Sequence, residues 1–374
     1  MKFNRYALSD LATIKYGKNQ KKVLSENGNI PIYGTGGLMG YATTALYDKP
    51  SVLIGRKGTI GKVKYVEHPF WTVDTLFYTI VNTDIVLPKY LYYVMSLIDL
   101  NNYNEGTTIP SLRTETLNRL EFDIPSLVEQ ETILSCLNPI DEKIALNNAI
   151  NNNLLEQALA IYKDWFCDYA LSDGILPENW KITTIDAISS LVTRGIAPKY
   201  DDSSDQIVLN QKCIRDHTID ISLSRRHLPK KINEKWISKG DLLINSTGTG
   251  TLGRVAQVWF EANNMTVDSH VTIVRPKDPI LQSYIGFWGL SHESEIEAQH
   301  TGSTGQTELP RDRVKAMELP LPDEDTLSKF NELVIPMTST VISNQEENDR
   351  LSQLRDALLP KLMSSELDVS DIDL

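Results

Sequence analysis

The sequence predicts an α+β protein with two similar domains, separated by two long helices that pair as an antiparallel coiled coil. Three observations lead to this fold class: an internal repeat, an alternation of charge along the chain, and a heptad pattern in the two acidic segments. The 374 residues also exceed the length of one ordinary domain.

The internal repeat covers nearly the whole chain. The motif Gly-Thr-Ile-Gly-Lys-Val at 58–63 returns as Gly-Thr-Leu-Gly-Arg-Val at 250–255, each time after an apolar run. Further along, Thr72-Val73-Asp74 returns as Thr266-Val267-Asp268. This period is far longer than the roughly 20 to 50 residues of solenoid repeats. The series indicates a duplicated domain-plus-linker unit, a pseudo-dimer within one chain that suits a target with two halves.

The net charge of −12 is unevenly distributed. Residues 1–126 carry +3, 127–178 carry −7, 179–322 carry 0 and 323–374 carry −8. Acidity opposes contact with phosphate, but here it belongs to two segments. The regions between them therefore remain suited to nucleic acid.

Four segments follow from the repeat and the charge. We predict recognition domains at 1–126 and 171–322, and helical spacers at 127–170 and 323–374. No apolar run reaches the roughly 18 to 20 residues of a membrane span. Three cysteines and six histidines are scattered along the chain. We expect a cytoplasmic protein with no metal site, no catalytic site and no membrane partner.

Both acidic segments carry a coiled-coil seam. Apolar residues recur in steps of four and three from Ile133 to Trp165, and again from Phe330 to Leu362, 197 residues later. Asparagines interrupt both seams at the same two steps, forming either a solvated helix face or polar pairs that fix the register. The residues predicted to pair the helices are Ile140, Ile144, Asn147, Asn151, Leu154, Met337, Val341, Asn344, Asn348 and Leu351.

Proline marks the same place in each acidic segment. Pro139 and Pro336 are equivalent in the repeat. Because proline lacks the N–H that a helix interior needs, we expect each long helix to start near its proline or to be kinked there.

Outside the helices the pattern is mixed, with short strands such as 52–54, 76–81 and 271–274 and a helix at 88–98. The Gly-rich motifs form either tight turns between strands or loops that bring backbone N–H groups close to DNA. They lack the spacing of a phosphate-binding P-loop. A basic cluster of Arg225, Arg226, Lys230 and Lys231 is either solvated or in contact with phosphate.

Arg and Gln pair with guanine and adenine edges, and Lys and Thr contact phosphate. On these grounds the candidate DNA contacts are Arg56, Lys57, Thr59, Lys62, Thr107, Thr108 and Arg113 in the first domain, and Thr247, Thr249, Arg254, Ser303, Thr304, Gln306, Arg311 and Arg313 in the second.

Several segments together resemble the specificity subunits of Type I restriction–modification systems. They are Val52–Ile54 with Gly58–Val63, Leu120–Pro125 leading into Glu129-Gln130, Ile140–Ile144, and Leu359–Ser370. The resemblance implies two target-recognition domains, each reading one half of a bipartite target in double-stranded DNA. It implies that two methylase subunits dock along the helices, and that restriction subunits join through them. It also implies that S-adenosylmethionine, ATP and Mg are bound by those partners, with no cofactor on this chain.

The two halves depart from each other at the helix ends. Arg355 stands on the second seam where Ala158 stands on the first, and Leu362-Met363 replace Trp165-Phe166. We therefore expect the two helix ends to dock unequally.

Two other functions compete with this interpretation. One is a methyltransferase or nuclease fused to a reader, but the chain contains no Pro-Pro dipeptide for a methyltransferase motif. Its Asp141-Glu142-Lys143, which resembles part of a nuclease site, falls on a predicted long helix. The other is a coiled-coil scaffold that does not bind DNA.

Overall fold

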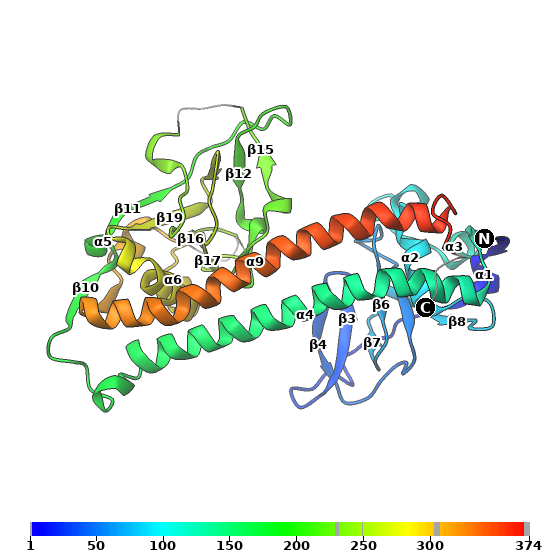
Figure 1. Cartoon of the computed structure of the whole chain (residues 1–374), viewed down its shortest axis with the longest axis horizontal. Coiled ribbons are helices and arrows are strands. Elements are labelled where there is room, and N and C mark those ends of the chain that lie inside the picture. The colour runs from blue at the N-terminus through cyan, green and yellow to red at the C-terminus, as the bar shows by residue number, and fades with distance from the viewer. Residues whose placement is uncertain (1, 229–231, 249, 303–306, 370–374) are drawn as a thin grey trace. The chain divides into compact units, whose positions relative to one another are not determined.

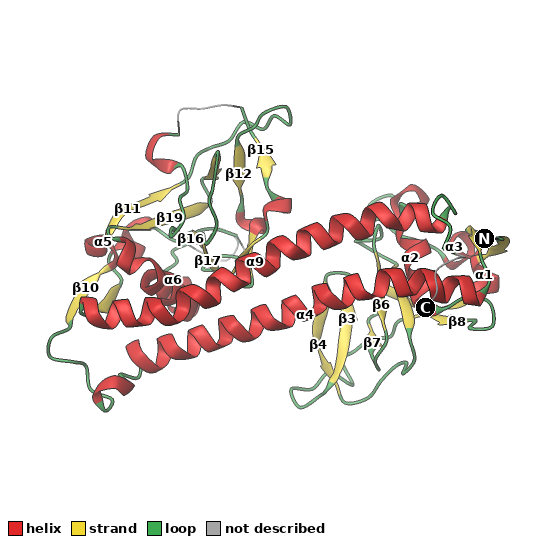
Figure 2. Cartoon of the chain, in the orientation of Figure 1, coloured by secondary structure: helices red, strands yellow, loops and turns green. Residues whose placement is uncertain are grey.

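The computed structural model describes residues 2–228, 232–248, 250–302 and 307–369. The chain divides into two compact units, each drawn from two stretches of sequence. Unit 1 comprises Met1–Ala145 and Asn348–Leu374, and unit 2 comprises Leu146–Glu347. Each unit holds one recognition domain together with part of each of the two long helices, α4 (Leu127–Phe166) and α9 (Glu324–Met363) (Figures 1 and 2).

Three antiparallel or mixed sheets form the recognition domain of unit 1. A four-stranded sheet has the order β2-β8-β5-β6, a three-stranded sheet has the order β4-β3-β7, and β1 pairs with β9. The strands are β1 (Asn4–Ala7), β2 (Ala12–Tyr16), β3 (Ile30–Gly34), β4 (Gly37–Ala42), β5 (Ser51–Gly55), β6 (Val63–Val66), β7 (Trp71–Thr72), β8 (Leu76–Val81) and β9 (Glu121–Ile124). The helices are α1 (Leu8–Leu11), α2 (Pro88–Ser96) and α3 (Thr114–Asn118).

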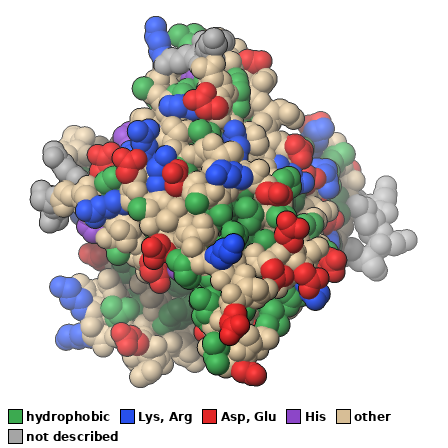
Figure 3. All heavy atoms as spheres, turned by 90° about the vertical axis from the view of Figure 1, so that its left-hand side faces the viewer, with side chains coloured by type: hydrophobic (Ala, Val, Ile, Leu, Met, Phe, Trp, Pro, Cys, Tyr) green, Lys and Arg blue, Asp and Glu red, His purple; other side chains and the backbone are tan. Residues whose placement is uncertain are grey.

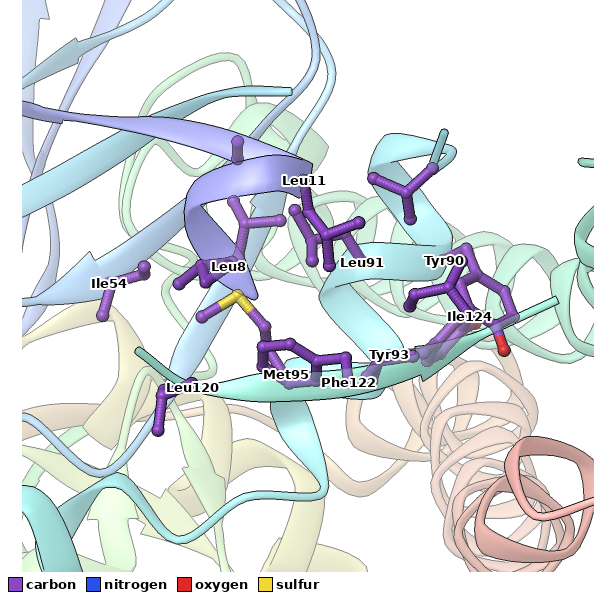
Figure 4. Packing of buried hydrophobic residues seen from close by; sticks show 14 of the residues in the cluster. Leu8, Leu11, Ile54, Tyr90, Leu91, Tyr93, Met95, Leu120, Phe122 and Ile124 are labelled. Carbon is purple, nitrogen blue, oxygen red and sulfur yellow. The ribbon is translucent and has the colours of Figure 1, made fainter. Parts of the chain in front are cut away.

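The core of unit 1 forms where α1, α2 and the four-stranded sheet meet (Figure 4). Leu8, Leu11, Tyr90 and Leu91 are fully buried there. Leu359 and Leu362 of α9 belong to the same cluster. The last part of the chain therefore completes the core of the first domain, and its burial ties the C-terminal part of α9 to that domain.

Unit 2 repeats this architecture strand for strand. Its four-stranded sheet has the order β11-β19-β16-β17, its three-stranded sheet the order β15-β12-β18, and β10 pairs with β20. The strands are β10 (Lys181–Thr184), β11 (Ser189–Arg194), β12 (Ile207–Leu209), β15 (Arg225–Arg226), β16 (Leu242–Asn245), β17 (Val255–Gln257), β18 (Met265–Val267), β19 (Val271–Pro276) and β20 (Glu318–Leu321).

The remaining elements of unit 2 comprise a small hairpin, β13 (Ile214–Arg215) with β14 (Thr218–Ile219), and the helices α5 (Ile185–Ile188), α6 (Gln282–Ser291), α7 (Glu293–Ala298) and α8 (Arg311–Lys315). The duplicated fold predicted from the repeat is confirmed, including the pairing of the long helices described below.

An aromatic cluster forms the core of unit 2. Tyr162 and Phe166 of α4 lie 5.3 Å apart between ring centroids. Phe166 also contacts Tyr284 of α6 and Phe330 of α9, each at 5.0 Å. These rings join both long helices of the unit to its recognition domain.

The long helices begin at equivalent caps. At the start of α4, Ser126 and Glu129 form reciprocal hydrogen bonds, with Glu129 N donating to Ser126 Oγ and Ser126 N donating to Glu129 Oε2. At the start of α9, Asp323 accepts from Thr326 N at 3.0 Å and from Trp180 Nε1 at 3.0 Å. Each helix thus begins immediately after a β-strand, β9 or β20, at a side chain that satisfies free backbone N–H groups.

Of the two expected alternatives, a helix start near each proline is wrong, and a kink at each proline stays a prediction. Pro139 lies inside α4, and Pro336 lies inside α9. Leu137 beside Pro139 is fully buried, as is Val334 beside Pro336. Burial of the flanking apolar residues offsets the backbone hydrogen bond that each proline removes, so the helices continue through them.

Candidate nucleic-acid interface

The Gly-rich motif of the first domain forms the connection between the antiparallel strands β5 and β6. This loop, residues 56–62, lies against the Gly/Thr-rich stretch 106–113, which holds the candidates Thr107, Thr108 and Arg113. Gly58 N donates to Pro110 O at 2.9 Å, and Leu112 N donates to Arg56 O at 3.0 Å. Two candidate segments far apart in sequence are thereby brought together by backbone hydrogen bonds.

The second domain has the same arrangement with a longer loop, residues 246–254. Leu309 N donates to Ser246 O at 2.8 Å, and Thr247 forms a β-bridge with Glu308. Gly58 has a φ of 87° and Gly248 has a φ of 97°. By these contacts Gly58 corresponds to Gly248, although the repeat in the sequence aligns it with Gly250. A loop longer by two residues explains the difference, because several glycines there match equally well.

Arg56 is held by its own domain. Its Nη1 donates to Asp74 O at 2.8 Å, and its guanidinium lies 5.0 Å from the centre of the Tyr16 ring. In the second domain Arg194, at the end of β11, donates to Ser269 O at 3.2 Å and Leu309 O at 2.7 Å. Arg56 thus ties the Gly-rich loop of the first domain to its sheet, whereas Arg194 ties the sheet of the second domain to the segment at Leu309 that contacts the loop.

Other candidates also have partners inside the protein. Arg113 pairs with Glu105, with 3.1 Å between Nε and Oε2, and Arg311 lies 3.6 Å from Asp312. Arg313 Nη1 donates to Gln299 O at 3.2 Å. The side chain of Thr247 lies 2.9 Å from His270 Nδ1 and also accepts from Gln211. These groups hold the loops in shape.

The remaining candidates are exposed or lie outside the described residues. Lys57, Thr59, Lys62, Thr107 and Thr108 are exposed, and Arg254 is half-buried. Thr249, Ser303, Thr304 and Gln306 lie outside the described residues, as do Lys230 and Lys231 of the basic cluster. Within the first domain, the exposed candidates come from two segments that contact each other.

A finer division of charge reveals groups that the sequence interpretation missed. Residues 15–64 contain nine Lys or Arg and only two Asp or Glu, a net charge of +7. This stretch holds β3, β4 and β5, together with the loop before β3 and the Gly-rich loop after β5. Counting charge over whole domains hid it, because residues 65–126 carry three basic and eight acidic side chains. The basic part of the first domain is the part that carries the Gly-rich loop.

Three exposed lysines, Lys18, Lys21 and Lys22, form what we call the lysine turn, residues 18–22. It is anchored to the three-stranded sheet, since Lys18 N donates to Thr72 O at 2.8 Å and Trp71 Nε1 donates to Lys18 O at 2.8 Å. Cations fixed on a rigid sheet suit the backbone of a nucleic acid, where phosphate contacts provide orientation and affinity.

The basic strand of the second domain is shorter. Arg225 and Arg226 form β15, and both are exposed. The Arg225 guanidinium lies 3.5 Å from the centre of the Tyr200 ring. In the view of Figure 3, basic and acidic side chains are interspersed, with hydrophobic side chains between them.

The seam asparagines are buried or half-buried, Asn344 being half-buried, and they take part in hydrogen bonds across the helices. Asn344 Nδ2 donates to Asn151 Oδ1 at 2.8 Å, and Asn147 Nδ2 donates to Glu347 Oε2 at 2.7 Å. Asn147 and Asn151 are buried, whereas Asn348 is half-buried. Going from Asn147 to Asn151 along α4, the hydrogen-bonded partner on α9 moves back from Glu347 to Asn344, so the helices run antiparallel.

The other seam residues are buried or half-buried. Ile140 and Val341 are buried, and Ile144, Leu154, Met337 and Leu351 are half-buried. This exposure is typical of two helices that pair along one stripe.

Asp141, part of the segment that resembles a nuclease site, lies in a polar cluster of unit 1. It accepts from Arg355 Nη1 at 3.1 Å and from the Tyr93 hydroxyl, and Lys89 Nζ lies 3.4 Å away. The pKa of Tyr93 is raised, mainly by burial. Its hydroxyl therefore stays protonated and donates a hydrogen bond to Asp141. Asp141 thus joins α2, α4 and α9 of unit 1, which is a structural role.

Neither a membrane span nor a metal site is found in the described part of the chain. No helix there is long and apolar enough to cross a bilayer. Among the same residues, no three His, Cys, Asp or Glu side chains gather in a metal-binding arrangement.

The chain is similar in sequence to proteins described as Type I restriction enzyme specificity subunits. Residues 2–156 match the family model of the Type I restriction modification DNA specificity domain. The Type I restriction enzyme MjaIX specificity subunit of Methanocaldococcus jannaschii is 25% identical over 352 residues, which cover 87% of this chain and 80% of the relative. The HindI specificity subunit of Haemophilus influenzae is 22% identical over 387 residues, covering 82% and 84%.

A solved structure has the same fold. The S subunit of a Type I restriction–modification system from M. genitalium aligns with a TM-score of 0.57 at 16% identity, over 97% of this chain and 96% of that one. The chain is thus similar to Type I restriction–modification specificity subunits, in residues 2–156 by the family model and over most of its length by the two relatives, and it shares the fold of the M. genitalium S subunit.

Proposed function

We propose that this chain is the sequence-specific DNA-binding subunit of a Type I restriction–modification complex and reads a bipartite target in double-stranded DNA. The observation that carries the proposal is the duplicated recognition domain, whose seven sheet strands in the two main sheets have the same order in both units. Two copies of one scaffold with different surface side chains suit a target with two different halves.

We assign each half-site to one domain, residues 1–126 and residues 171–322. The basic stretch 15–64 of the first domain, with its net charge of +7, supports contact with phosphates there. The exposed candidates Lys57, Thr59, Lys62, Thr107 and Thr108 lie on segments joined to this stretch or within it.

The chemistry belongs to other subunits in this proposal. The chain directs adenine methylation and restriction, and two methylase subunits and their restriction subunits carry them out, with S-adenosylmethionine, ATP and Mg bound by those partners. The acidic helical segments, at −7 and −8, support contact of the helices with protein rather than with DNA. Asp141 is engaged by Arg355 and Tyr93, so the nuclease-like segment is better explained as structure.

The test is adenine methylation in cells that lack other such systems. The chain expressed with its methylase subunits should produce one bipartite methylated motif, and the purified chain alone should methylate nothing. Replacing residues 1–126 with the matching domain of a relative should change one half of the motif and leave the other intact. A change in both halves would contradict the assignment of half-sites to domains, and a complex in which the chain assembles with its partners but does not bind DNA would favour a scaffold.

A further inference from the structure

The three-stranded sheets of the two domains differ in chemistry at one equivalent position. In the first domain β4 is the edge strand, and Ile32 of β3 lies opposite Gly40. In the second domain β15 is the edge strand, and Ile207 of β12 lies opposite Arg226. At the next pair, Tyr33 lies opposite Leu38 and Val208 lies opposite Arg225. Leu38 of the first domain therefore stands where the second domain has Arg225, and Gly40 stands where it has Arg226.

The edge strand of the first domain exposes large apolar side chains. Leu38 and Met39 are each 54% exposed, and Tyr41 is 45% exposed. Met39 is the extra residue of a β-bulge, because Ile32 lies opposite Gly40 while Tyr33 lies opposite Leu38. Bulges redirect side chains, and proteins usually protect an edge strand with charge or proline because exposed apolar edges promote association. Leu24 pairs with Ala42 at one end of this edge, and the exposed apolar side chains of Leu38 and Met39 beyond that end indicate a binding surface.

Charge on both sides of this edge identifies the kind of partner. The lysine turn continues into Val23–Ser25, whose backbone is bonded to β4 through Ser25 N and Tyr41 O at 2.9 Å and through Thr43 N and Val23 O at 3.1 Å. At the other end of β4, the Gly-rich loop lies close to the β3–β4 turn. An alanine at Gly58 would place its Cβ 4.0 Å from Thr35 Oγ1 in that turn. The apolar strand thus lies between Lys18–Lys22 and the loop that holds Lys57 and Lys62.

Apolar groups flanked by fixed cations suit a duplex read in its major groove. The cations contact the phosphates of both strands, and a two-stranded β-ribbon fits the width of the groove. The apolar group that a base pair presents in that groove is the C5-methyl of thymine. At the equivalent position of the second domain, arginines are the side chains that pair with guanine O6 and N7. One strand position would then read thymine in one domain and guanine in the other.

We propose that Leu38 and Met39 of the β3–β4 hairpin recognise thymine methyl groups in the half-site of the first domain. The proposal rests on the DNA-reading function above and names the reading strand within it. Because the partner subunits methylate adenine in the proposed function, the half-site contains at least one A·T pair and hence a thymine.

The experiment combines a protein change with a DNA change. The target motif is first mapped with the wild-type complex of the chain and its methylase subunits, and duplexes are then made with uracil in place of each thymine of the first half-site. Uracil lacks only the methyl group, so wild-type affinity should fall about fourfold for each methyl contacted, from the transfer of one carbon. The variant L38S/M39S should bind the normal duplex at least about tenfold more weakly, as for a lost base contact, and should be insensitive to uracil.

Matched variants separate reading from folding. L38I/M39L should retain both affinity and sensitivity to uracil. Ile182→Ser, a change at a residue of β10 that is 57% exposed, should alter neither. Uracil in the second half-site should affect the wild type and L38S/M39S equally.

Each result decides between defined alternatives. Indifference of the wild-type complex to uracil, or equal sensitivity of wild type and L38S/M39S, would overturn the assignment of Leu38 and Met39. Unchanged DNA affinity with altered assembly of the complex would instead make the edge strand a protein contact. A wild-type complex that yields no methylated motif would overturn the proposed function itself, before the hairpin is tested.

Discussion

Asn344 on α9 donates a hydrogen bond from Nδ2 to Oδ1 of Asn151 on α4, over 2.8 Å. The bond lies on the seam of the helix pair, where each asparagine has an apolar residue one step away on one side, Leu154 or Val341, and a second asparagine on the other. A buried amide pair contributes less stability than packed leucines, but it is satisfied in one register only.

Replacing one asparagine should therefore be worse than replacing both. Asn151→Leu leaves the Asn344 amide without its partner, at a cost of about 1–3 kcal/mol. The double variant N151L/N344L should recover that loss and add alternative pairings of the helices. Urea unfolding measures the stabilities, and light scattering after gel filtration measures the oligomers. Additive effects of the two single changes would show that the asparagines do not act as a pair.

Arg355 should be essential to the polar cluster of unit 1, although its counterpart on the other seam is Ala158. Arg355→Ala removes a charged hydrogen-bond donor from the half-buried Asp141, so unfolding should become easier by about 1–3 kcal/mol. The second change Asp141→Ala should cost less in this background than in the wild type. The control is Arg350→Ala at an exposed position of the same helix. If Arg355→Ala lowered the free energy of unfolding no more than Arg350→Ala does, the polar cluster would not contribute to stability.

The cap of α9 should make unit 2 sensitive to acid. Hydrogen bonds, first of all from the backbone N–H of Thr326, hold the pKa of Asp323 below its ordinary value of 3.8. A carboxyl group with a lowered pKa stabilises the fold above its unfolded pKa, and this stabilisation is lost as the pH falls through the folded value. Asp323→Asn keeps a capping oxygen but removes the charge, so at pH 7 it should cost less than a lost cap, which costs about 0.5–2 kcal/mol, and the difference from wild type should shrink below about pH 4.

Tryptophan fluorescence during urea unfolding measures this effect, since the Trp180 indole itself donates to Asp323. Glu324→Gln, at an exposed neighbour, should leave the acid profile unchanged. A constant difference between Asp323→Asn and wild type from pH 7 to pH 3 would exclude the carboxylate as the titrating group.

The lysine turn should supply affinity without sequence preference. Replacing Lys18, Lys21 and Lys22 with alanine should weaken binding to every duplex and leave the methylated motif unchanged, because phosphates are the same at every base pair. The slope of log K against log salt should become less steep by up to about 2.7, or about 0.9 per phosphate contact. Lys329→Ala, which removes a cation already paired with Asp325 at 2.7 Å, is the control. An unchanged slope of log K against log salt would show that the DNA phosphates do not contact the lysine turn.

The sequence by itself determined the duplicated fold, because that information is local or periodic. A heptad seam needs only residues three and four apart, and the asparagines at Asn151 and Asn344 are visible as interruptions of it. Likewise the repeat around Gly58 and Gly250 revealed two domains before any contact was known. The family resemblance followed from the same segments.

Only the tertiary structure decided which side chains meet, because those contacts join residues far apart in the chain. Asp141 and Arg355 are separated by 214 positions, and no spacing rule relates them. Arg56 is a candidate DNA contact by its residue type, and only the structure shows that it also donates to Asp74 and lies over the Tyr16 ring. The exposed edge strand at Leu38 and Met39 is not among the strands that the sequence predicts, and the position of a strand within its sheet depends on pairing that the local pattern does not encode.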